Sequence, residues 1–113
     1  MGGAGNRATG IWAVASGGYS NLASGYLAAV IGGSQSSASG EYSTITGGNV
    51  NSATGNNSWI GGGELNTAGG ILSGVCGGEQ NMAAGYGSVI GGGRSHSVTG
   101  TDNWEAGTLF EPN

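Results

Sequence analysis

Residues 51–62 read NSATGNNSWIGG, and residues 81–92 carry the same pattern as NMAAGYGSVIGG. The unit recurs every 15 residues along the chain, and it organises most of the 28 glycines into a lone glycine and a glycine pair. The lone glycines are Gly10, Gly25, Gly40, Gly55, Gly70, Gly85 and Gly100, and the pair recurs from Gly2-Gly3 to Gly92-Gly93. A period this strict predicts a stack of near-identical coils, not a globule built around one active site.

The first strand of the coil is predicted from two columns of residues, three and five positions after each lone glycine. An aliphatic column recurs two residues after a column of alanine and serine, so both face one side of a strand. The residue between them varies freely, which places it on the outer face. The aliphatic column is Ala15, Val30, Ile45, Ile60, Val75 and Ile90, and the serine column is Ala13, Ala28, Ser43, Ser58, Ser73 and Ser88. We expect Val30, Ile45, Ile60, Val75 and Ile90 to form the core.

A second strand is predicted just before each lone glycine. Its inner face pairs an asparagine column with an alanine column two residues later. Identical asparagines stacked one repeat apart can hydrogen-bond along the stack, so we expect an asparagine ladder there. The ladder residues are Asn6, Asn21, Asn51, Asn66 and Asn81, with Ser36 and His96 in the same column, and the alanine column is Ala8, Ala23, Ala38, Ala53, Ala68, Ala83 and Val98.

The glycines are expected to form the corners, because glycine reaches positive φ or a close backbone approach without a Cβ penalty. Two strands and two corners make one flattened coil, and about seven such coils predict an all-β rod on the order of 35 Å long. Its interior is poor in apolar area, whereas ordering each residue costs about 1–2 kcal/mol of backbone entropy. We therefore expect several chains to share one core as an obligate oligomer.

The repeated unit Asn-x-Ala-Ser/Thr-Gly-x-x-Ser-x-Ile/Val-x-Gly-Gly resembles the head repeat of trimeric autotransporter adhesins, and similar repeats occur in bacteriophage fibres. The resemblance covers residues 1 to about 107, and this repeat is one residue longer than the usual head repeat. It implies a left-handed parallel β-roll, or β-solenoid, whose chains are intertwined or packed as a homotrimer. Residues 1–107 would form the repeat domain and residues 108–113 a C-terminal cap or tail.

Composition and resemblance together favour a structural or adhesive role without enzymatic activity. The chain has no lysine, two basic residues and a net charge of −4, which disfavours nucleic-acid or anionic-membrane binding. We expect a bacteriophage fibre or decoration protein on the virion surface, with attachment to a host-surface glycan or protein. The alternative is the receptor-binding head fragment of a bacterial surface adhesin. No cofactor is expected, and Cys76 is interpreted as a small filler, with a thiol paired across subunits as the alternative.

Exposed aromatic residues are the candidate binding surface, because they stack on sugars and anchor protein contacts. Trp59 lies on the outer row of the first strand. The others follow the lone glycines at a corner, where a trimer would bury them against a neighbour; they are Trp12, Tyr26, Tyr42 and Tyr86.

His96 occupies the asparagine column and has no acidic residue nearby in the sequence. If that column faces a threefold axis, three imidazoles could bind a metal or an anion; otherwise His96 ends the ladder as a neutral hydrogen-bonding group. Glu79 and Arg94 lie one repeat apart and should form a surface ion pair.

The last repeat changes character. Glu105 replaces the aliphatic residue, and a buried unpaired carboxylate is costly, so the repeat should stop there. A cap is expected from Trp104, Leu109, Phe110 and Pro112. The N-terminal edge has no such residues and is expected to dock on a virion or stalk protein.

Overall fold

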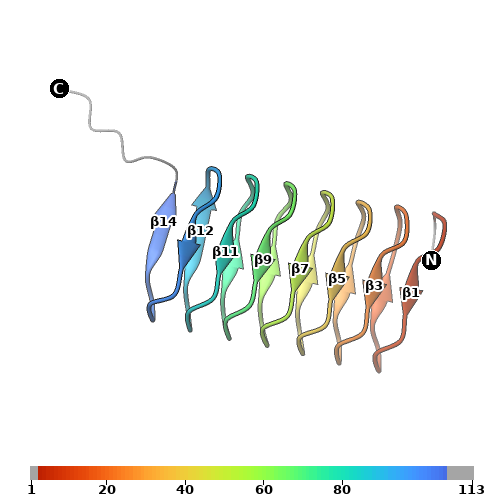
Figure 1. The fold of residues 1–113 in the computed structure, drawn as a ribbon. Coiled ribbons are helices and arrows are strands. Elements are labelled where there is room, and N and C mark those ends of the chain that lie inside the picture. The colour runs from red at the N-terminus through yellow and green to blue at the C-terminus, as the bar shows by residue number, and fades with distance from the viewer. Residues whose placement is uncertain (1–2, 107–113) are drawn as a thin grey trace.

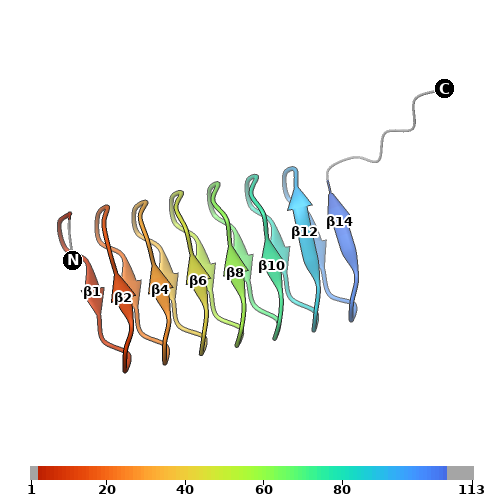
Figure 2. The same cartoon turned by 180° about the vertical axis from the view of Figure 1, so that it is seen from behind.

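The computed structural model describes residues 3–106 as a stack of β-coils with no helix among them. Two parallel sheets of seven strands each form the two sides of the stack (Figures 1 and 2). One sheet contains β1 (Arg7–Ala8), β3 (Leu22–Ala23), β5 (Ser37–Ala38), β7 (Ser52–Ala53), β9 (Thr67–Ala68), β11 (Met82–Ala83) and β13 (Ser97–Val98). The other contains β2 (Val14–Ala15), β4 (Ala29–Val30), β6 (Thr44–Ile45), β8 (Trp59–Ile60), β10 (Gly74–Val75), β12 (Val89–Gly92) and β14 (Trp104–Ala106).

Strand register confirms the 15-residue coil. Each strand pairs in parallel with the strand one repeat later, so that Val30 lies beside Ile45 and Ala38 beside Ala53. Most strands are only two residues long, which is shorter than the sequence pattern indicated. A third row of bridges, not predicted from the sequence, follows the glycine pairs and joins Ala4, Tyr19, Ser34, Asn49, Glu64, Glu79 and Arg94. At a strand spacing of about 4.8 Å, the seven coils form a rod roughly 30 Å long.

The core lies inside each coil, between the two sheets. The predicted core residues Val30, Ile45, Ile60, Val75 and Ile90 are at most 1% exposed within the single chain. The alanine, serine and asparagine columns are buried with them through the middle of the stack. The expectation that several chains pool these columns is therefore wrong, because one chain already removes them from water.

The asparagine column confirms the predicted ladder, but its bonds run between side chain and backbone. Asn66 donates from Nδ2 to Gly62 O of its own coil (3.0 Å) and to Gly78 O of the next coil (2.9 Å). Its Oδ1 accepts from the backbone N–H of Asn81 (2.9 Å). Both amide hydrogens and the carbonyl are thus satisfied in a buried position, and each asparagine fixes the corner carbonyls of two coils.

The second glycine of each pair is required by conformation and by space. Gly63 has a φ of +85°, and a Cβ there would overlap Gly78 O and lie 2.7 Å from Asn66 Nδ2. A Cβ would overlap the carbonyl of the next coil in the same way at Gly18, Gly33, Gly48 and Gly78, and Gly93 shares the positive φ (+98°). The first glycine differs, since a Cβ on Gly62 would meet nothing within 4 Å.

The lone glycines are required for close stacking, not for positive φ. A Cβ on Gly25 would overlap Gly40 O of the next coil, and the same holds along the column as far as Gly85, where a Cβ would overlap Gly100 O. None of the lone glycines has a φ in the left-handed region. Of the two reasons expected for glycine at the corners, the close backbone approach applies to this column, and positive φ applies to the second glycine of each pair.

Two corners instead place residues other than glycine in the left-handed region. The first corner is the residue pair after each lone glycine, and the second corner is the pair after each glycine pair. The second residue of each has φ near +55°, as in Leu72 (+60°) and Leu65 (+58°). This conformation turns the N–H back toward the preceding coil, where Leu72 N donates to Asn56 O (2.9 Å) and Leu65 N to Asn49 O (3.0 Å). The N–H groups of the strands donate to the following coil, as Val14 N does to Ala28 O. The hydrogen bonds at the corners therefore run in the opposite direction to those of the strands.

We predict that Gly63→Ala lowers the free energy of unfolding by at least about 2 kcal/mol, because it adds left-handed strain and overlaps the next coil. Gly62→Ala is the matched control and should change it by less than ~0.5 kcal/mol. Urea unfolding followed by circular dichroism measures both. Equal losses in the two variants would contradict the close-stacking account of this column.

Ser36 interrupts the asparagine column and offers a second test. Ser36→Asn should add donors to Gly32 O and Gly48 O and raise the free energy of unfolding by about 1 kcal/mol. The reverse change, Asn66→Ser, should lower it by about 1–3 kcal/mol, because buried corner groups lose their partners. Thermal unfolding of the two variants measures both signs. A loss of stability in Ser36→Asn would show that the ladder does not control the stack.

Candidate functional surface

Residues 3–106 enclose no pocket, and no group of three or more His, Cys, Asp or Glu side chains among them could hold a metal ion. The interior is filled by small side chains and by the asparagine bonds. On the outside of the coils, three features carry the candidate residues. These are the outer face of the even-numbered strands, the first corner, and the last coil.

Trp59 lies on the outer face of β8, as the sequence predicted, and is 39% exposed. Its indole covers Gly74 of the next coil, since a Cβ on Gly74 would overlap the ring at Cε2. Gly74 is buried for this reason, although it occupies an outward position. The ring thus lies over the backbone of β10 and presents a flat apolar surface to solvent.

Trp104 lies on the same face and leans toward the preceding coil. Its ring approaches Gly91, where a Cβ would lie 3.5 Å from Cζ2. Trp59 covers β10 and Trp104 approaches the neighbouring strand β12, so the two indoles are directed toward one region of the sheet. The outward residues around them carry no charge, and Cys76 among them is a free, exposed thiol.

The first corner carries a row of aromatic rings on three successive coils. The ring centroids of Trp12 and Tyr26 are 5.8 Å apart, and those of Tyr26 and Tyr42 are 5.7 Å apart in an edge-to-face arrangement. Trp12 is 72% exposed, Tyr42 is exposed and Tyr26 is half-buried. Tyr86 lies exposed on the same corner, farther along the stack. The structure therefore brings Trp12, Tyr26 and Tyr42 together and separates them from Trp59.

Aliphatic residues extend this corner, and the sequence interpretation missed them by considering only aromatic side chains. Ile11, Leu27, Ile71 and Leu72 are all exposed there. The signal was present in the sequence, because each of them follows a lone glycine in the same way as the aromatic residues. We call the eight residues together the apolar corner; they are Ile11, Trp12, Tyr26, Leu27, Tyr42, Ile71, Leu72 and Tyr86.

In the last described coil, His96 Nδ1 is in hydrogen-bond contact with Glu105 Oε1. No acidic residue lies close to His96 in the sequence, but the coil brings Glu105, nine residues away, beside it. The chain continues through β14 at this point, with Glu105 in register with Ile90, and the half-exposed carboxylate is paired rather than isolated. The missed signal was that His96 replaces the asparagine and Glu105 replaces the aliphatic residue in the same, last coil.

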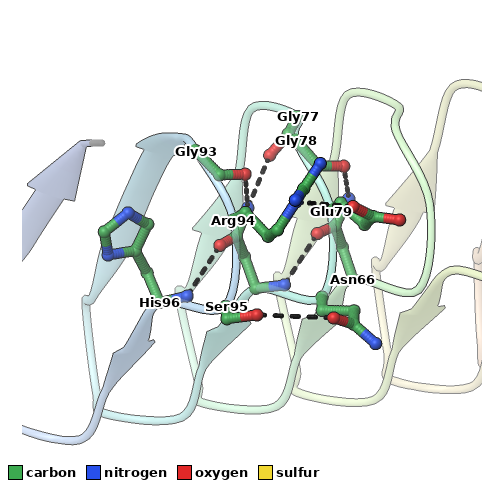
Figure 3. Close-up of polar contacts among 10 residues, drawn as sticks. Asn66, Gly77, Gly78, Glu79, Gly93, Arg94, Ser95 and His96 are labelled. Carbon is green, nitrogen blue, oxygen red and sulfur yellow. Dashed lines mark hydrogen bonds and ion pairs between the residues drawn. The ribbon is translucent and has the colours of Figure 1, made fainter. Parts of the chain in front are cut away.

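The asparagine column faces the interior of its own coil, so the premise for a metal site at a threefold axis fails. His96 does end the ladder, with its backbone N–H donating to Asn81 Oδ1 at 2.9 Å (Figure 3). Its imidazole, however, contacts Glu105 instead of continuing the asparagine pattern. The predicted domain boundary after residue 107, and the cap residues Leu109, Phe110 and Pro112, lie outside the described residues.

A polar row runs along the second corner. Arg94 Nε lies 2.8 Å from Glu79 Oε1, which confirms the predicted pair (Figure 3). Asn49 Nδ2 donates to Glu64 Oε2 one coil on (3.2 Å). These contacts are exposed, and each is worth about 0–1 kcal/mol.

Comparison with known proteins leaves function to be argued from this geometry. No protein-family model matches the chain, and no curated protein matches its sequence. In the described part of the chain, no helix is long and apolar enough to cross a membrane.

We predict energetic coupling between His96 and Glu105. Glu105→Val and His96→Asn, each alone, should leave the other charged or polar group without its partner, whereas the double variant restores the columns of the inner coils. A double-mutant cycle by thermal unfolding should give a coupling free energy of about 0.5–1 kcal/mol. Additive effects of the two substitutions would contradict a functional ion pair in the last coil.

Proposed function

We propose that the protein is a non-enzymatic fibre element, a homotrimer of β-solenoids that serves a bacteriophage virion as a fibre or decoration protein and attaches to a cell surface. The observation that supports this most is a rod whose interior is closed and whose outer faces carry ordered, exposed aromatic rings. A stack of coils offers long, regular faces, which suit repeated weak contacts along a surface.

Trp59 is the proposed centre of attachment. Its indole is held in place over Gly74, so little side-chain entropy is lost when a ligand packs on the open face of the ring. The surrounding outward positions lack charge, which favours a neutral ligand such as a glycan or an uncharged protein patch. Trp104, directed toward the same region, would extend the contact area.

We predict that Trp59→Ala reduces binding of the fluorescently labelled protein to its target cells by at least about 10-fold, as expected for loss of an aromatic anchor. Met82→Ala is the matched control, because Met82 is a similarly exposed apolar residue on the opposite sheet. Binding should be measured on a panel of bacterial strains and on animal cells, with thermal unfolding to show that both variants fold.

The two cell types separate the proposal from the adhesin alternative. Trp59-dependent binding to bacterial strains supports the virion role, and Trp59-dependent binding only to animal cells or their glycans supports an adhesin head. Binding to neither surface, or binding that Trp59→Ala leaves unchanged, contradicts an adhesive role for this face.

A further inference from the structure

We infer that the apolar corner is the surface through which copies of this chain associate side by side, parallel and in register. The inference rests on the proposed self-association and identifies the face that makes it. The core gives no reason for oligomerisation, since each chain buries it alone, so the reason has to lie on the outside of the rod.

The two corners of the coil have the same backbone conformation but different side chains. Both bind to the preceding coil through a residue with φ near +55°. At the second corner most side chains are polar or charged, and three are large and apolar: Tyr19, Val50 and Leu65. At the first corner eight are large and apolar, and only Glu41 and Asp102 are charged. The backbone cannot explain this difference, so it reflects what the first corner contacts.

Conformational strain strengthens the argument. A left-handed conformation costs roughly 1–2 kcal/mol for a residue with a Cβ, and asparagine, aspartate and glycine tolerate it best. Asn57, Gly87 and Asp102 meet that preference, whereas Trp12, Leu27, Tyr42 and Leu72 do not. These four side chains are also exposed to solvent, so the single chain gains little from them. Strained, exposed, bulky apolar residues point to a contact made outside the chain.

The spacing of the apolar corner selects the partner. Its residues recur with each coil over much of the stack, so a partner that contacts them all must repeat at the same spacing of about 4.8 Å. A second copy of this chain that lies alongside the first has the same spacing, because it is built from the same coils. Side chains exposing on the order of 100 Å² each would bury roughly 800 Å² per copy, the size of a standard stable interface.

Asn56 and Asn57 interrupt the apolar corner in the middle coil and fix the alignment. Parallel copies in register place these asparagines together in one layer, where their amides can bond to one another. A shift by one coil would press them against Tyr42 or Leu72 and leave polar groups unpaired. A single polar layer in an apolar seam selects register in this way in coiled coils.

The test uses the full chain with Leu27→Asn and Leu72→Asn combined, and Val50→Asn with Leu65→Asn as the matched control. Both pairs relieve left-handed strain, at the first and second corner respectively. Sedimentation equilibrium should show a wild-type trimer of the 10.8 kDa chain. The first-corner variant should raise the dissociation constant at least about 100-fold, and the control should leave it unchanged.

Thermal unfolding separates loss of association from loss of folding. Because asparagine suits the left-handed region, the first-corner variant should remain folded, with an unfolding midpoint that no longer depends on protein concentration. The control should unfold a few degrees higher than wild type.

The possible failures of this inference can be told apart. An oligomer that survives the first-corner substitutions, or that the control dissociates, overturns this interface but leaves self-association intact. A wild-type monomer at micromolar concentration overturns both the interface and the proposed trimer. A wild-type oligomer of another size with first-corner dependence keeps the interface and corrects the number of copies.

Discussion

The requirement that every coil superimpose on the next controls this structure. At a strand spacing of about 4.8 Å, each residue lies directly against the residue one repeat later, so a side chain that fits must fit beside its own copy. Where backbones approach closely, as at Gly25 and Gly63, only the absence of a Cβ allows the contact. Where corner carbonyls turn inward, the asparagine column supplies the donors. The strict repeat in the sequence is the direct record of this constraint.

The same constraint lets a single chain bury its own core and leaves the side chains that differ between coils on its surface. Small side chains and fully bonded asparagines fill the space between the two sheets, so a single chain excludes water from it. The positions that differ from one coil to the next point outward. Trp59 over Gly74, the apolar corner and the polar second corner give the rod three chemically distinct sides.

Much of the fold could be predicted from the sequence because each coil shows the same pattern of residue types again. The inward columns, the two strands per coil and the outward position of Trp59 all followed from period-two alternation read seven times over. The left-handed corner residues other than glycine, such as Leu65 and Leu72, could not be predicted, because their residue types do not favour that conformation. The shared core was wrong because the apolar area was judged without the asparagine bonds to the corner backbone, which close each coil on itself.

The last coil and the apolar corner show a different limit. His96 and Glu105 pair across the coil, and their separation in the sequence hides that contact. Leu27 and Leu72 look like core residues by type, and only the backbone shows that they are strained and exposed. An apolar residue type suggests burial, whereas the geometry of the coil decides whether the side chain points inward or toward solvent.

The central claim is that one chain encloses the asparagine column without help from a partner. Hydrogen exchange of the asparagine side-chain amides, followed by NMR at concentrations low enough to give monomers, tests it most directly. The account predicts that the amides of Asn21, Asn51, Asn66 and Asn81 stay protected on dilution, while those of exposed Asn56 and Asn57 exchange rapidly. Loss of protection at Asn51 and Asn66 when the chains separate would contradict it.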